Sequence, residues 1–253
     1  MFLFSPKLPV TEEDRRWVDE GFKRLESVLG KDRMLRAKAV LPIAEDFPDR
    51  FDKTEAAANA LFNRVCSYMG VNSESIEFGV YADEIEGLRE LLPYWRNPGR
   101  NYAAGLYFPQ QHSDHTDSNQ CNFKPLVAIK KSLLKDPLAA VATMAHEIGH
   151  VILLGGNLMD PQAPDHEPMT DLLTVFLGLG VFNANASARF TQRQSDRGYE
   201  WSMKQLGYLP EHVFGYALAR FAKERGEDKP EWEPYLSTNV RSYFKSSRAW
   251  LAQ

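Results

Sequence analysis

The chain has 253 residues, of which 43% are hydrophobic and 25% are charged, and it carries a net charge of −4. This composition is that of a soluble globular protein with a sizeable core, and the acidic balance argues against nucleic-acid binding through bulk positive charge. Two cysteines, Cys66 and Cys121, are too few for a secreted scaffold held by disulfides, so we expect reduced thiols.

The beginning of the chain, MFLFSPKLPVTEEDRRW, lacks a basic segment followed by a long apolar stretch, so no signal peptide is expected. The most apolar runs are Leu138–Leu154 and Leu172–Ala184. The second is too short to span a bilayer, which needs about 20 apolar residues, and both are typical of buried helices. We therefore expect a cytoplasmic protein with no membrane span and no nucleic-acid partner.

Two helices are expected first. Thr11 begins a pattern of apolar residues at helical spacing that Gly30 ends, and a second helix should run from Lys53 to Met69, with Gly70 as its stop. Three short β-type runs follow: Ser75–Tyr81, Tyr102–Phe108 and Leu126–Ile129. The polar stretch Pro109–Lys124 between the last two is expected to be a long surface loop, or else a lid.

Asp136 and Pro137 are a favoured helix start, with a carboxylate at the N-cap and proline at the first helical position. That helix should continue to Gly155, and another apolar helix should run from Glu167 to about Phe182. Later helices are expected at Arg193–Leu206, Pro210–Arg225 and Ser237–Leu251. The pattern predicts an α+β fold with an N-terminal helical layer (1–70), a metal-binding core (71–226) and a C-terminal helical extension (227–253), which are expected to pack as one compact unit.

His146, Glu147 and His150 form an HExxH motif inside the helix that begins at Pro137. Residues four apart lie on the same face of an α-helix, so both imidazoles can direct a nitrogen at one metal ion. Zinc accepts such ligands and needs one further protein ligand if a position is to stay open for water. Glu147 can then accept a proton from that water. Two core histidines and a solvated glutamate would be the structural alternative.

The third ligand must come from another segment. The candidates follow a reversing loop: Asp160, Asp165, His166, Glu167 and Asp171. Glu167 and Asp171 share a helix face, so we expect Glu167 to bind the metal and Asp171 to hydrogen-bond a ligand histidine and fix its tautomer. Ligation by His166 or Asp165 stays open, as does simple capping of the helix N-terminus by the two acids.

HExxH followed after a short loop by ExxxD resembles the gluzincins, the thermolysin-like superfamily of zinc peptidases. The resemblance covers roughly residues 75–185. It implies a zinc site formed by His146, His150 and Glu167, with Glu147 as general base and Asp171 as the supporting carboxylate. The metzincin pattern does not fit, because it needs glycine where this chain has Leu153.

The order strand, long loop, strand and helix before the motif is similar to the minigluzincin core, a zincin-like fold. In that fold an edge strand pairs with an extended substrate, which here would be Tyr102–Phe108 or Leu126–Ile129. The resemblance implies a zinc metallopeptidase that acts on a peptide or protein. Two alternatives stay open: a non-catalytic zinc-binding module that binds a protein partner, and a zinc hydrolase of small amides.

Weaker signals concern three other groups of residues. A group that stabilises the oxyanion is expected downstream, and the candidates are His212, Tyr199, Tyr208 and Tyr216. The loop residues His112, Asp114, His115 and Asp117 resemble a metal cluster only in composition, and a polar surface loop is the simpler interpretation. The last helix has a basic face that is expected to be solvated: Arg241, Lys245 and Arg248.

Overall fold

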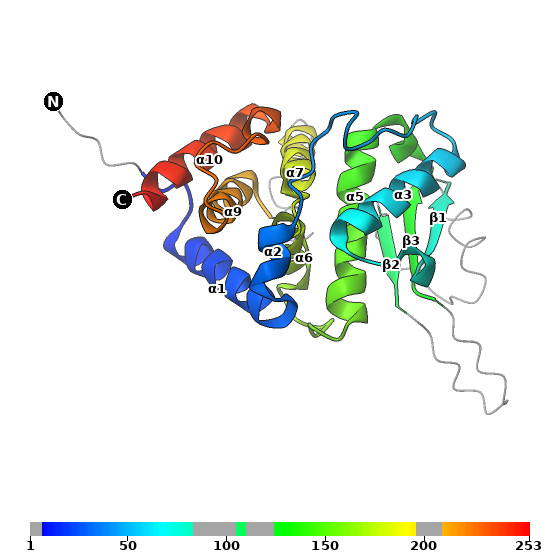
Figure 1. Ribbon diagram of the computed structural model, residues 1–253, viewed down its shortest axis with the longest axis horizontal. Coiled ribbons are helices and arrows are strands. Elements are labelled where there is room, and N and C mark those ends of the chain that lie inside the picture. Colours follow the sequence, from blue (N-terminus) through cyan, green and yellow to red (C-terminus); the bar gives the residue numbers. More distant parts are fainter. Residues whose placement is uncertain (1–6, 83–104, 110–123, 196–208) are drawn as a thin grey trace. The chain divides into compact units, whose positions relative to one another are not determined.

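The computed structural model describes residues 7–82, 105–109, 124–195 and 209–253 (Figure 1). These residues are mostly helical and include one small mixed sheet of three strands, which confirms the α+β class. They pack into two compact units, residues 43–160 on the one hand and residues 1–42 with 161–253 on the other. The functional division suggested by the sequence, with bounds at residues 70 and 226, remains a prediction.

The unit of residues 43–160 sets two helices against a sheet. Its strands are β1 (Glu77–Tyr81), β2 (Gly105–Phe108) and β3 (Leu126–Lys130), and its helices are α3 (Glu55–Met69) and α5 (Pro137–His150). The central strand β3 runs parallel to β1 and antiparallel to β2. Helix α3 packs on β1 and on α5, and α5 packs on β2 and β3 (Figure 1).

Side chains of the sheet alternate between its two faces, as the period of a strand requires. On the face toward α3, Phe78 stacks on Phe62 with 4.4 Å between the ring centroids. The opposite face carries a cluster of apolar side chains: Tyr81, Leu126, Ala128, Leu106 and Phe108. The first four residues of β3 are all buried, because this strand has a neighbour on each side and a packed layer on at least one face. The uninterrupted apolar run of β3 follows from that position.

The other unit is helical. Its helices are α1 (Glu12–Leu29), α2 (Lys31–Arg36), α6 (His166–Phe176), α7 (Gly180–Ser195), α9 (Glu211–Glu224) and α10 (Thr238–Leu251). Helix α1 contacts α6 and α9, and α9 packs most extensively against α10. Between α1 and α6, the rings of Phe22 and Phe176 lie 6.1 Å apart. Burial of such side chains contributes about 25 cal/mol of stability per Å² of apolar surface. Burial of the apolar core is therefore the main interaction that stabilises the packing of these helices.

The start of α1 follows the sequence-based expectation. The hydroxyl of Thr11 accepts a hydrogen bond from the backbone N–H of Asp14 and donates one to its carboxylate, which is a reciprocal N-cap. Gly30 ends the helix, as predicted. The short helix α2, which begins directly after Gly30, is not among the predicted elements, because its six residues are too few to show a periodic pattern.

The chain between α6 and α7 differs from the expectation. The sequence predicts one helix from Glu167 to Phe182, but α6 ends at Phe176 and α7 begins at Gly180. Gly178 lies between them with a φ of +87°, a conformation that interrupts a right-handed helix. Its carbonyl accepts a hydrogen bond of 2.9 Å from the backbone N–H of Val40. A contact distant in sequence therefore fixes this break, which helical periodicity alone does not reveal.

Two further expectations have partial outcomes. The predicted helix start at Arg193 is wrong, because α7 runs on to Ser195, and the rest of that predicted helix lies outside the described residues. Cys66 is a buried free thiol, as expected, and burial raises its pKa to about 12. The thiol is therefore protonated and unreactive at neutral pH. Cys121 and the residues of the 110–123 segment lie outside the described chain.

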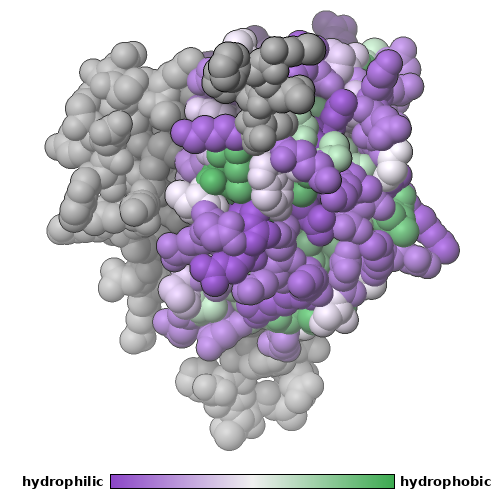
Figure 2. Space-filling view, turned by 90° about the vertical axis from the view of Figure 1, so that its left-hand side faces the viewer, coloured by the Kyte–Doolittle hydropathy of each residue, from purple (hydrophilic) through white to green (hydrophobic). Residues whose placement is uncertain are grey.

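Large apolar side chains are only scattered over the described surface. The exposed ones are Val28, Leu35, Leu138 and Tyr235. Figure 2 views the side on which α10 lies in Figure 1, and the described residues of that face are largely hydrophilic, with small separate hydrophobic patches. Scattered residues of this kind are normal for a globular protein and do not indicate a docking surface.

Gly178→Ala tests the break between α6 and α7. A Cβ at this position would collide with the carbonyl oxygen of Lys38, and φ is positive, so we expect the free energy of unfolding to fall by more than about 2 kcal/mol. Gly226→Ala is the matched control, because Gly226 also has positive φ but, apart from its chain neighbours, no described residue lies within 4 Å of the place that the added methyl group would take. Urea denaturation measures both, and equal losses would contradict the steric explanation.

Candidate metal site

Helix α5 begins with the cap that the sequence predicts. The carboxylate of Asp136 accepts a hydrogen bond of 3.1 Å from the backbone N–H of Ala139, and Pro137 occupies the first turn. The helix continues beyond His150 as a π-helical segment, Val151–Gly155. Such segments are rare and occur frequently at functional sites. The two histidines of the motif therefore stand at the end of a well-started helix, directly before a local change of helical winding.

Pro137–Gly155 is also long and apolar enough to cross a membrane, judged by length and composition alone. Within the protein, however, 61% of this stretch is buried. The core helix of a soluble protein has the same properties, so the expectation that the chain has no membrane span remains a prediction.

His146 and His150 are nearly fully buried, with 4% and 5% of their surfaces exposed. Their ring centroids lie 4.8 Å apart and their planes are almost perpendicular. This is the arrangement that the four-residue spacing predicts for one helix face. Two adjacent polar rings in an otherwise apolar helix are costly to bury unless hydrogen bonds or a metal satisfy their nitrogens.

Glu147 is buried as well, with 5% of its surface exposed, and it lies against strand β2. Strand β2 approaches it at Gly105, where a Cβ would stand 2.6 Å from a Glu147 carboxylate oxygen and 2.5 Å from the Thr143 methyl group. Only glycine allows the strand to come this close. The solvated glutamate of the structural alternative is therefore not what the structure shows, and the carboxylate is held between the helix and β2.

Tyr107, two residues along β2, contacts the same face of α5. Its ring stacks on that of His150, with 6.0 Å between centroids and 23° between planes. The hydroxyl is buried, has no hydrogen-bond partner in the described part of the chain, and reaches the backbone at Gly155. Burial raises the pKa of Tyr107, so the hydroxyl is protonated at neutral pH. No pattern in the sequence indicates this contact, because strand pairing and helix packing create it together.

Glu167 lies in the first turn of α6 and is partly buried. One ligand atom from each of His146, His150 and Glu167 lies within 4.8 Å of the others. These three residues are the group of potential metal ligands in the described chain, and they can hold a metal ion. Two imidazoles and one carboxylate are donors that suit zinc. The structure thus brings together the three ligands that the sequence predicts.

The other ligand candidates have different surroundings. Asp160 is exposed, and a carboxylate oxygen of Asp165 accepts a hydrogen bond of 3.2 Å from the indole N–H of Trp17. The Nδ1 atom of His166 lies 3.9 Å from a carboxylate oxygen of Glu167. Among the described residues, Glu167 is the one of these candidates that the group of potential metal ligands includes.

Asp171 is buried, with 2% of its surface exposed. Its Oδ2 atom accepts a hydrogen bond of 2.9 Å from the backbone N–H of Leu209, just before α9. The sequence does not indicate this contact, since it joins residues that are far apart in the chain. The hydrogen bond that a ligand histidine is expected to donate to Asp171 remains a prediction.

The candidates for an oxyanion-stabilising group divide into two sets. Tyr216 donates a hydrogen bond of 2.9 Å to Asp19, and burial raises its pKa. His212 lies 4.0 Å from Asp14 and edge-on to Tyr243. Both side chains are thus engaged within the helical unit. The remaining candidates, Tyr199 and Tyr208, lie outside the described residues, as do His112 and its neighbours.

Comparison with known proteins adds no family to this picture. No model of a protein family matches the chain, and neither a curated protein nor a solved structure matches it.

Gly105→Ala tests the close approach of β2 to α5. The added methyl group would overlap with Thr143 and Glu147, so we expect a loss of about 1–3 kcal/mol in the free energy of unfolding, the usual cost of overpacking. Thr143→Ser removes the methyl group of the closest contact, and in the double variant it should recover part of the loss. A double variant whose stability is the sum of the two single effects would contradict this explanation.

Proposed function

We propose that the protein is a gluzincin-type zinc metallopeptidase with a zincin-like core, in which His146, His150 and Glu167 hold the metal. The observation that carries the proposal is the group of three ligand atoms within 4.8 Å, two of them from buried imidazoles on one helix face. A set of two histidines and one carboxylate leaves a fourth zinc position for water or substrate. Such an open position is what hydrolysis requires.

Zinc bound here would supply a Lewis acid that polarises a peptide carbonyl and makes water a better nucleophile. Glu147 takes the proton from the attacking water and delivers it to the leaving amine. Its position supports this role, because the contact at Gly105 restrains the carboxylate beside the two histidines. A buried carboxylate with a fixed orientation loses little freedom when it transfers a proton.

The substrate we propose is an extended peptide that pairs with β2. The strand order β1-β3-β2 places β3 in the centre, so the run Leu126–Ile129 has partners on both sides and is excluded as the docking edge. Among the described strands, β2 lies at an edge of the sheet, and it contacts α5 through Gly105 and Tyr107. An added strand at this edge would lie beside Glu147, and its backbone hydrogen bonds would orient the scissile bond.

The metal content of purified protein tests the site. We expect about one zinc per chain in the wild type and a strong loss in Glu167→Ala, because removal of one of three ligands weakens a site of this kind severely. Glu55→Ala is the matched control, since Glu55 is also an acidic residue in the first turn of a helix, α3, and is exposed. Elemental analysis after dialysis against dilute zinc gives the stoichiometry.

The result separates the interpretations. A wild type that binds no zinc in the presence of excess metal would overturn the proposed function. Zinc retained in full by Glu167→Ala would keep a metal site but move the third ligand to His166 or Asp165, and the gluzincin assignment would be lost with it.

Glu147→Gln tests the chemistry. The amide keeps the size of the side chain but cannot accept the proton, so zinc content and unfolding free energy should stay near those of the wild type while peptide hydrolysis falls by at least about a hundredfold. The assay follows the cleavage of a peptide library by mass spectrometry, with small amides measured in parallel. Equal cleavage by the variant would disprove the role of Glu147, and cleavage of small amides alone would point to an amide hydrolase.

A further inference from the structure

Helix α1 contacts the helix that carries the third ligand at its very start. The indole N–H of Trp17 donates to the carboxylate of Asp165 over 3.2 Å, and Asp165 is the N-cap residue of α6, two positions before Glu167. The Asp165 side chain makes no capping hydrogen bond to its own helix. An N-cap aspartate usually accepts a hydrogen bond from a backbone N–H in the first turn of its own helix. Here the Asp165 side chain is instead held by α1.

A second contact lies one turn further along α1. A Cβ at Gly21 would collide with a methyl group of Leu172 and would stand 3.5 Å from the end of Met169. The two helices thus come as close as the absence of a side chain permits. Because Trp17 and Gly21 are four residues apart, they lie on the same face of α1. That face holds α6 both at its N-cap and one turn beyond Glu167.

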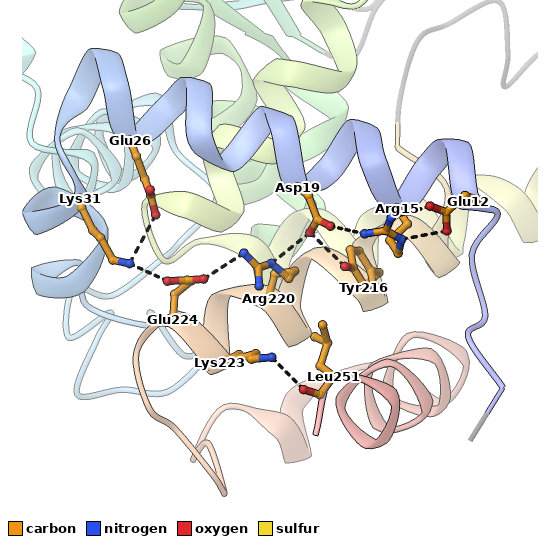
Figure 3. Close-up of polar contacts among 10 residues, drawn as sticks. All are labelled: Glu12, Arg15, Asp19, Glu26, Lys31, Tyr216, Arg220, Lys223, Glu224 and Leu251. Atoms are coloured by element: carbon orange, nitrogen blue, oxygen red, sulfur yellow. Dashed lines mark hydrogen bonds and ion pairs between the residues drawn. The ribbon is translucent and has the colours of Figure 1, made fainter. Parts of the chain in front are cut away.

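Helix α1 is itself fixed to α9 by a row of charged and polar contacts (Figure 3). Asp19 contacts Arg15 on its own helix and Tyr216 and Arg220 on α9. At the other end of the row, Lys31, the first residue of α2, lies 2.6 Å from Glu224 on α9, and this contact lowers the pKa of Glu224. Pairs that solvent still reaches are individually weak, but these partly buried contacts and the apolar core together restrict the rotation of α1 about its axis.

We propose that Trp17 is a positioning residue for Glu167. Its bond to Asp165 sets the direction in which the first turn of α6 leaves the preceding loop, and hence the direction in which that turn holds Glu167. This inference rests on the proposed function, because it takes Glu167 to be a metal ligand. Trp17 touches neither the metal nor the substrate, so its effect is expected in metal affinity and in the geometry of the site.

Trp17→Phe removes the N–H donor and keeps an aromatic ring. We expect its zinc affinity, measured by competition with a chelator, to fall about three- to tenfold, somewhat less than the effect of losing a direct hydrogen-bond partner of a ligand. The visible spectrum of the cobalt-substituted protein should change in intensity, since it reports the coordination geometry. Trp232→Phe is the matched control, because the Trp232 indole also donates to a carboxylate, that of Glu227, at 2.8 Å, away from α6.

A thermodynamic cycle separates positioning from general destabilisation. If Trp17 acts through Glu167, Trp17→Phe should not weaken zinc binding further once Glu167→Ala is present. The urea stability of the metal-free protein, measured for all four species, shows whether the fold is intact. Supporting results are a loss of affinity in Trp17→Phe, little change in Trp232→Phe and no additional loss in the double variant.

Failure of the positioning role and failure of the proposed metal site give different results. Wild-type affinity in Trp17→Phe, or the same fold-loss in the presence and absence of Glu167, would overturn the positioning role and leave the metal site intact. A wild type without zinc, or one in which Glu167→Ala has no effect on zinc, would overturn the proposed third ligand and this inference with it.

Discussion

Burial of three polar side chains within one turn of an apolar helix is the constraint on which the rest of the site depends. His146, Glu147 and His150 are each at most 5% exposed, and polar groups in such a position lower stability unless they are satisfied by partners. The surrounding structure is adapted to them at two points. Gly105 has no side chain and therefore lets β2 pack against Glu147, and the ring of Tyr107 stacks on that of His150. Either a larger residue at position 105 or a different register of β2 would displace the carboxylate.

Register is the link between the sheet and this site. In the antiparallel pair, Gly105 lies opposite Ile129 and Tyr107 opposite Val127, so both residues of β2 that matter face the same side of the sheet. A slip of one residue would bring Leu106 and Phe108 to the helix and turn Gly105 and Tyr107 away from it. The apolar cluster on the opposite face, which includes Leu106 and Phe108, opposes such a slip. Packing on the face away from α5 thereby helps to fix the residues next to Glu147.

The parts of the site that can be predicted from the sequence are those with local causes. The Asp136 cap, the four-residue spacing of the histidines and the acid pair after the loop depend on helix geometry alone, and the structure agrees with all three in its local features. The roles of Gly105, Tyr107 and Trp17 cannot be predicted in this way, because each depends on a contact with a segment that is distant in sequence. The break at Gly178 cannot be predicted for the same reason, since the hydrogen bond to Val40 crosses the helical unit.

Asp171 combines a contact that local spacing predicts with a contact that joins distant segments of the chain. Its spacing from Glu167 is local, and it predicts a contact with a ligand imidazole, whereas its bond to the Leu209 backbone is long-range. An ionised carboxylate has two oxygens and accepts more than one hydrogen bond, so the two contacts are compatible. The same side chain can then tie the start of α9 to the helix that carries Glu167. With Trp17 at the N-cap of α6 and Asp171 one turn after Glu167, this helix is anchored on both sides of the residue that we propose to bind zinc.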